Sequence, residues 1–170
     1  MLQFLLGARS KLVIFDVGAY RGESALFFSE CFEDARIFSV EPDPESFSKL
    51  VSLSLNNVSA YQLAISDHSG MQSFYRNSIP HLNSLVPLNK ASIDSVDLNS
   101  MESRDNQRVF SKAENREIKV EVLTLGDFFK LTRVEHVDLL KIDVQGAEDL
   151  VLSAGGDSLF HTDAILVEIS

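Results

Sequence analysis

The chain has 170 residues, 45% of them hydrophobic and 24% charged, which is the size and composition of one globular domain with a buried core. Its 15 basic and 25 acidic residues give a formal net charge of −10, which argues against nucleic acid or an anionic membrane as a partner, because both require a basic face. With one cysteine, four scattered histidines and no apolar run of about 20 residues, we expect no disulfide, no metal site, no membrane span and a cytoplasmic location.

Strands and helices alternate through the first third of this single domain, which we take as residues 1–170. We expect strands over Leu12–Phe15, Ile37–Val40 and about residues 60–65, with helices over Glu23–Phe32 and from Pro44 onward. The alternation favours a mostly parallel sheet covered by helices on both faces.

The helix that begins at Pro44 has clear local signals. Asp43 is a good N-cap, and proline suits the first helical position, where its missing N–H costs nothing. The spacing of the apolar residues predicts a buried stripe made of Phe47, Leu50, Val51 and Leu55.

The second half of the chain starts with an irregular stretch. We expect a short strand over residues 71–77, then a variable loop or lid over 77–117, because so long a polar segment is uncommon inside a compact domain. The elements expected after it are a half-exposed or edge strand over Ile118–Val122, a short helix from Thr124 to Leu131, a strand over Val137–Val144, a helix over 147–154 closed by Gly155 and Gly156, and a last strand over Ala164–Ile169.

The turn between the first strand and the first helix has the spacing Gly-x-x-x-Gly, formed by Gly18 and Gly22. Glycine lets the backbone pass close to a ligand, and the helix that follows presents free N–H groups. Dinucleotide folds instead use Gly-x-Gly-x-x-Gly, so a ligand with a cationic centre, attracted by Asp16, fits this turn better than a pyrophosphate. The alternative is a tight turn that needs glycine for its geometry alone.

An acidic residue ends the second strand, since Glu41 lies 25 positions after Asp16. A carboxylate at that place accepts both hydroxyls of a ribose. Taken alone, Glu41 is better explained as a surface carboxylate before a proline-rich turn. Together, the two features favour a nucleoside site at the carboxyl ends of the strands.

Five segments in this order resemble the FkbM-type S-adenosylmethionine-dependent methyltransferases. They are Asp16–Gly22, Val40–Pro44, Ala64–Asp67, Thr124–Phe128 and Leu140–Glu148. The resemblance implies the class I methyltransferase fold, a three-layer Rossmann-like α/β sandwich, and methyl transfer from S-adenosyl-L-methionine to a hydroxyl of a small molecule or sugar. It also implies that Asp16 and Gly18 line the methionine end of the cofactor, that Glu41 holds the ribose, and that Ser66 and Asp67 lie beside the adenine.

The chain departs from the family pattern in two places. Gln145 replaces a glutamate that is usual after the fourth strand, and members usually continue beyond Glu168 into a helix and a closing antiparallel pair of strands. We therefore expect a sheet without those strands. Its last strand would be a bare apolar edge, which predicts self-association into a homo-oligomer.

Two residues are candidates for the base that removes the hydroxyl proton. Asp143 follows an apolar strand and is the first candidate, with helix capping as its alternative role; His81, in the long loop, is the second, unless it is simply solvated. Lys141 is expected to snorkel or to pair with a carboxylate. Two rival functions stay open: a non-catalytic cofactor-binding module, favoured by Gln145, and a nicotinamide-dependent oxidoreductase, disfavoured by the missing middle glycine.

Overall fold

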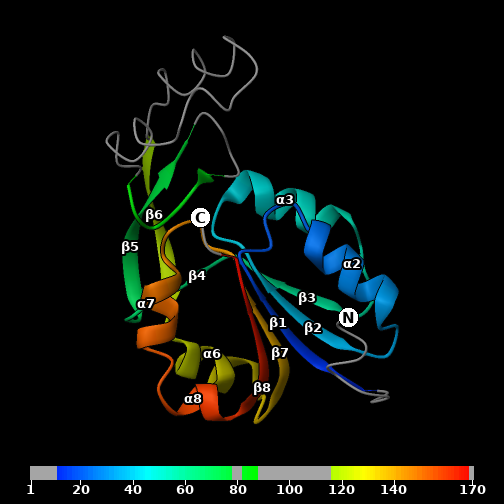
Figure 1. Cartoon of the computed structure of the whole chain (residues 1–170). Helices are drawn as coiled ribbons and strands as arrows, with labels where there is room; N and C mark the ends of the chain where they lie inside the picture. The colour runs from blue at the N-terminus through cyan, green and yellow to red at the C-terminus, as the bar shows by residue number, and fades with distance from the viewer. Residues whose placement is uncertain (1–10, 78–81, 88–115, 169–170) are drawn as a thin grey trace, which may run out of the picture.

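The computed structural model describes residues 11–77, 82–87 and 116–168 (Figure 1). Its main element is a five-stranded sheet in the order β3-β2-β1-β7-β8, in which every neighbouring pair is parallel. The strands are β1 (Val13–Val17), β2 (Arg36–Val40), β3 (Val58–Tyr61), β7 (Val137–Ile142) and β8 (Thr162–Val167). The predicted α/β class with a mostly parallel sheet is confirmed.

Helices cover both faces of this sheet, which gives three layers (Figure 1). On one side lie α2 (Glu23–Cys31) and α3 (Pro44–Ser52); on the other lie α6 (Leu125–Thr132) and α8 (Asp157–Phe160), with α7 (Glu148–Ser153) nearer the second sheet. The alternation along β1 explains this arrangement, because Ile14 packs with Phe28 of α2 whereas Phe15 packs with Phe128 of α6.

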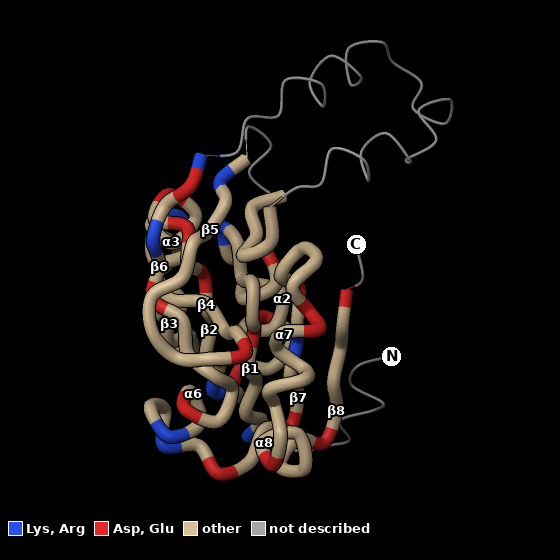
Figure 2. The backbone as a smooth tube through the Cα atoms, turned by 90° about the vertical axis from the view of Figure 1, so that its left-hand side faces the viewer, with Lys and Arg blue, Asp and Glu red and all other residues tan. Residues whose placement is uncertain are grey.

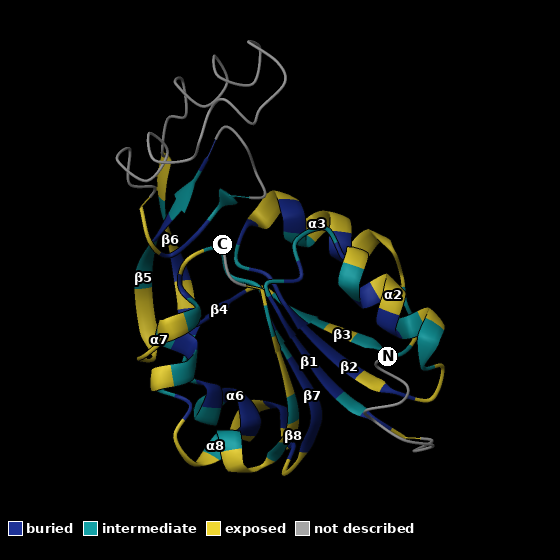
Figure 3. Ribbon diagram, in the orientation of Figure 1, coloured by how far each residue is buried: buried dark blue, intermediate teal, exposed yellow. Residues whose placement is uncertain are grey.

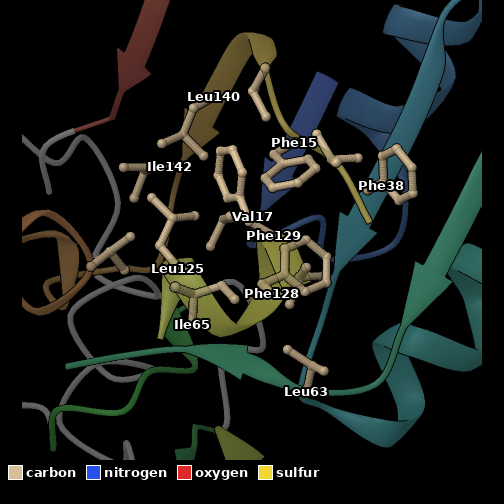
Figure 4. Close-up of a cluster of buried hydrophobic side chains, with 14 residues drawn as sticks. Phe15, Val17, Phe38, Leu63, Ile65, Leu125, Phe128, Phe129, Leu140 and Ile142 are labelled. Atoms are coloured by element: carbon tan, nitrogen blue, oxygen red, sulfur yellow. The ribbon is translucent and has the colours of Figure 1, made fainter. Parts of the chain in front are cut away.

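The larger part of the core lies between the sheet and α6, where four phenylalanines meet (Figure 4). The ring of Phe15 makes edge-on contacts with Phe38, Phe128 and Phe129 at centroid distances of 5.5, 4.9 and 5.0 Å. Such pairs contribute about 0.5–1.5 kcal/mol each beyond the burial of their area. This packing fixes β1 and β2, the strands whose ends carry Asp16 and Glu41.

A second, three-stranded sheet has the order β4-β6-β5 and is made of β4 (Ala64–Ile65), β5 (Gly70–Arg76) and β6 (Arg116–Leu123). Seen from the side, β5 and β6 lie at the same end of the molecule as α3 (Figure 2). Arg76 holds them there, since its guanidinium pairs with Asp43 at 2.5 Å and with Glu45 at 3.3 Å.

The single strand expected over residues 60–65 is wrong. The chain forms β3 in the main sheet up to Tyr61 and then β4 in the second sheet from Ala64. The break has a packing reason, because Leu63 and Ile65 turn into the core on the α6 side (Figure 4). Residues 118–122 were expected to form a half-exposed or edge strand; the first alternative is confirmed, because β6 is exposed on one face but is the central strand of its sheet.

The stripe predicted for α3 is narrower than expected. Leu50 is buried and Phe47 and Leu55 are half-buried, but Val51 is 51% exposed. Val51 follows Leu50 by about 100° around the helix, which turns it out to solvent. The cap is confirmed, because Asp43 Oδ1 accepts from the backbone N–H groups of residues 45 and 46.

The later elements differ from expectation mainly at their ends. The fourth main-sheet strand stops at Ile142 instead of Val144, and an unexpected short helix, α8, follows Gly156. Of the expected loop 77–117, the structure describes Asn77, residues 82–87 and the first residues of β6. Within the described part of the chain, no helix is both long and apolar enough to cross a membrane.

The last strand forms an edge of the main sheet. Among the described residues β8 pairs with β7 alone, and its neighbouring residues Ile165 and Leu166 are 42% and 44% exposed. Figure 3 colours β8 as intermediate or exposed along its length. An open apolar edge was expected here over Ala164–Ile169; the described part of it ends at Glu168.

Candidate functional site

A cavity of about 670 Å³, including the open space at its mouth, lies where the strand order of the main sheet reverses between β1 and β7. Open α/β sheets bind ligands at this switch point. The carboxyl ends of β1, β2 and β7 supply one wall: Val17, Gly18, Tyr20, Val40, Glu41, Pro42, Asp143, Val144 and Gln145. The second sheet and the segment 82–87 supply the other: Ala64, Ile65, Phe74, Asn83 and Leu85.

The glycine turn is required by geometry and also faces the cavity. Gly18 has a φ of +81°, and a Cβ on it would lie 1.8 Å from the carbonyl oxygen of Asp143. Gly22 is constrained by its φ of +97°, whereas the atom nearest to its Cβ would be at the movable end of the Leu53 side chain, at 2.5 Å. The geometry of the turn thus requires these glycines, and Gly18 and Tyr20 also form part of the cavity wall, so a ligand-binding role for the turn stays a prediction.

Glu41 is a buried carboxyl in the cavity wall, so its alternative reading as a surface residue is wrong. Its Oε2 accepts from the Tyr20 N–H at 2.9 Å and its Oε1 from the Asp43 N–H at 2.7 Å. Burial raises the pKa of Glu41 to about 8, and outweighs these two backbone hydrogen bonds, which lower it. The carboxyl thus links the glycine turn to the end of β2 and lines the space beside both.

Asp16 lies behind the cavity wall and not in it. Its carboxylate is fully buried and accepts from the hydroxyls of Ser24 at 2.9 and 2.8 Å and of Ser39 at 3.3 Å. The ammonium group of Lys141 is 3.3 Å away, as the expectation that this lysine pairs with a carboxylate requires. Asp16 can therefore influence a ligand in the cavity only through the groups that it contacts.

Asp143 lines the cavity, and two donors hold its carboxylate. Gln145 Nε2 donates to Oδ1 at 2.6 Å, and Lys141 Nζ lies 3.4 Å from Oδ2. The helix-capping alternative is wrong: α7 has no side-chain cap, and Glu148 binds the backbone N–H groups of Val144 and Gly146 before it. This leaves Asp143 as a charged group at the end of β7, facing the open space.

The two residues predicted beside the adenine lie outside the cavity wall. Ser66 is buried and its hydroxyl is 3.0 Å from Gln72 Oε1, whereas Asp67 is half-exposed and pairs with His68 at 2.7 Å. Ala64 and Ile65, just before them, line the cavity instead. His81, the second candidate base, lies outside the described residues.

Three residues that sequence reasoning missed, Phe74, Asn83 and Leu85, complete the wall. They are in place because Ser84 pairs with Tyr75 of β5 and donates its hydroxyl to the Val144 carbonyl at 3.1 Å. Leu85 is an apolar residue within a polar stretch, which is a weak signal, and no local pattern indicates that this segment returns to β7.

A separate group of three possible metal ligands lies at the opposite end of the sheet, where β7 and β8 begin. Atoms of His136, Asp138 and Asp163 lie within 4.8 Å of one another. His136 pairs with Asp163 at 3.2 Å, and Asp138 accepts from the Val13 N–H at 2.7 Å. These contacts account for the group by joining the starts of three strands.

A parallel three-layer α/β domain with a cavity at its switch point has a Rossmann-like fold. Within this fold class, the sequence model of the methyltransferase FkbM domain matches residues 16–170. The chain belongs to the FkbM methyltransferase family, as the resemblance implied. No solved structure matches the chain significantly.

Three relatives similar to this chain are named as methyltransferases. Methyltransferase 1 of Beauveria bassiana is 30% identical over 92% of this chain and 64% of its own length. The 2-O-methyltransferase NoeI of Sinorhizobium fredii is 28% identical over 93% of this chain and 63% of its own, and methyltransferase sdnD of Sordaria araneosa is 30% identical over 82% and 58%. The chain thus spans about three fifths of the length of these relatives.

Proposed function

We propose that this chain binds S-adenosyl-L-methionine and transfers its methyl group to a hydroxyl of a small molecule or sugar. The observation that carries the proposal is the buried carboxyl of Glu41 in the wall of a switch-point cavity, next to a glycine turn, in a chain of a methyltransferase family. A carboxyl there suits the two hydroxyls of a ribose.

The residues present fit this cofactor. Gly18, Glu41 and Asp143 line the same cavity, and Asp143 supplies a negative charge there. When bound, the cofactor supplies an electrophilic methyl group on a cationic sulfur. In the transfer the hydroxyl oxygen forms a bond to the methyl carbon, the carbon–sulfur bond breaks, and the hydroxyl proton leaves.

Asp143 is our candidate to accept that proton, because it faces the cavity at the end of β7. Its oxygens already receive donors from Lys141 and Gln145, so an acceptor hydroxyl would bind a remaining lone pair. His81 stays the alternative base. Alignment of the two reactants and exclusion of water supply the rest of the acceleration.

The choice of a hydroxyl acceptor is supported by the name of one relative, a 2-O-methyltransferase. We expect no nucleic-acid substrate, because the net charge is −10. A cytoplasmic location stays a prediction. Binding without catalysis is the second candidate function, favoured by the Gln145 amide that occupies Asp143, and a nicotinamide cofactor is disfavoured by the glycine spacing.

Calorimetry with S-adenosylmethionine, its demethylated product and a nicotinamide dinucleotide tests the cofactor. We expect binding of the first two only. Glu41→Ala is expected to weaken both by roughly ten- to a hundredfold, the effect of losing the hydrogen bonds to the two ribose hydroxyls. Glu45→Ala, an exposed carboxylate on α3, is the matched control.

Turnover is then tested by release of the demethylated product with a panel of sugars and other hydroxylated acceptors. Cofactor binding without turnover on any of them would favour the binding module. No binding by the intact protein, or an unaffected Glu41→Ala variant, would reject the proposed cofactor site.

A further inference from the structure

The ammonium group of Lys141 lies between two carboxylates. It does not line the cavity itself, but it contacts Asp143 and Gly18, which do. Its Nζ is 3.3 Å from Asp16 Oδ1, 3.4 Å from Asp143 Oδ2 and 3.2 Å from the Gly18 carbonyl, to which it donates. The Lys141 side chain is 12% exposed and that of Asp16 is fully buried, so water screens these charges weakly. We call Asp16, Lys141 and Asp143 the lysine cluster.

The cluster follows from the strand register. β1 and β7 pair in parallel with Asp16 opposite Lys141, and Asp143 lies two residues after Lys141, so the three side chains share one side of the sheet. Of these groups only Asp143 lines the cavity, together with Gly18. Lys141 therefore acts on a bound ligand through its field and by fixing these two neighbours.

The formal charge of the cluster is −1, from two carboxylates and one ammonium. Gln145 adds a hydrogen bond to it but no charge. The methyl donor is a cationic sulfonium, whereas its demethylated product is a neutral thioether. A negative cluster next to the sulfur binds the donor better than the product, and a more negative one would do so further.

Strong binding of the sulfonium has a cost for catalysis. Its positive charge disappears as the methyl group leaves, so any attraction that is greater in the ground state than in the transition state raises the barrier. An ammonium group that cancels one of the two carboxylates reduces this attraction without removing either carboxylate from its position.

We propose that Lys141 is a positioning residue that holds the cluster charge at −1 and so limits the preference of the site for the cationic methyl donor over its neutral product. This proposal rests on the proposed function, because it assumes that the cavity takes S-adenosylmethionine. The quantity it concerns is the ratio of the dissociation constants of product and donor.

A series of four proteins tests it at one pH. Lys141→Met gives a cluster charge of −2, Asp16→Asn gives 0, and the double variant returns to the −1 of the intact protein. If about 7 Å separates the changed charge from a bound cation, in an effective dielectric constant of about 20 to 80, one unit of charge changes the affinity for that cation by roughly 3- to 50-fold. We expect the ratio to rise by this factor in Lys141→Met, to fall similarly in Asp16→Asn, and to return to the starting value in the double variant.

Calorimetry of both ligands gives the ratio without any turnover assay. A merely structural role for Lys141 would weaken both ligands alike and leave the ratio constant across the series, which would overturn the proposal while the proposed function stands. If the intact protein binds neither ligand, the proposed function itself fails. If Lys141→Met does not fold, the comparison of Asp16→Asn with the double variant still varies the cluster charge by one unit. Lys141→Arg keeps the charge, so it must leave the ratio of the two dissociation constants unchanged.

Discussion

Replacing Glu41 by glutamine should change how the stability of the fold depends on pH. Burial raises the pKa of Glu41 from 4.5 to about 8 in the folded chain. Between these values the folded state keeps a proton that the unfolded state releases, so its stabilising contribution is complete below pH 4.5 and is lost as the pH rises through 8. The shift of about 3.5 units corresponds to about 5 kcal/mol in total, of which about 4 kcal/mol falls between pH 5 and 9.

Glutamine has nearly the same shape but does not titrate. Its single carbonyl oxygen keeps only one of the two backbone hydrogen bonds, from Tyr20 and Asp43, and leaving the other N–H unpaired costs about 1–3 kcal/mol. Glu41→Gln should therefore be less stable than the parent at pH 5 and more stable at pH 9, so that the two curves cross.

Urea unfolding followed by circular dichroism at several pH values between 5 and 9 measures this difference directly. Other titrating groups cancel when the variant is subtracted from the parent. Glu45→Gln is the control: it is exposed, and its hydrogen bond with Lys49 lowers its pKa, so it titrates below this window. If the free energies of unfolding of Glu41→Gln and its parent change in parallel with pH, the conclusion that Glu41 is buried and protonated is refuted.

Three further predictions concern the site and the sheet edge. Asp143→Asn should weaken S-adenosylmethionine as the loss of one negative charge from the lysine cluster requires, leave the affinity for the demethylated product and the melting temperature nearly unchanged, and reduce methyl transfer by roughly 10²–10⁴; undiminished turnover would exclude it as the base. Gly18→Ala should destabilise the fold strongly in thermal melts, because its Cβ meets the Asp143 carbonyl, whereas Gly146→Ala, with an equally positive φ but open space, should cost only about 1–3 kcal/mol; equal effects would contradict the close approach. The 170-residue chain should self-associate through β8 in light scattering and Ile165→Lys should make it monomeric, whereas a monomeric parent at high concentration would contradict this.

Most of the fold could be predicted because its signals are local. Both the apolar run that forms β1 and the Asp43 cap of α3 depend on residues that are only a few positions apart in the sequence. The division of residues 60–65 could not, because β4 pairs with β6, which lies almost sixty residues further along the chain. Nothing near Leu63 indicates that its partners are on α6.

The candidate site shows the same limit. Gly18, Glu41 and Asp143 follow strands of one parallel sheet, so their meeting at its carboxyl edge could be expected from the alternation of elements alone. Asn83 and Leu85 reach the cavity through the hydroxyl of Ser84 on the Val144 carbonyl, a contact across about sixty residues that no pattern indicates.

Asp16 shows how register decides between two roles for the same residue. As the acidic residue before the glycine turn, it was expected in the wall of the site, yet strand alternation turns Asp16 towards Ser24 of α2 and leaves the next residue, Val17, to line the cavity. Opposite it in the sheet, Lys141 provides the counter-charge that a buried carboxylate requires. The same ammonium group of Lys141 also contacts Asp143, which lines the cavity. The positive charge that stabilises Asp16 in the core therefore also contributes to the electrostatic potential in the cavity. In this fold, the ion pair that β1 and β7 need in order to bury Asp16 is therefore also a determinant of the electrostatics of the candidate site.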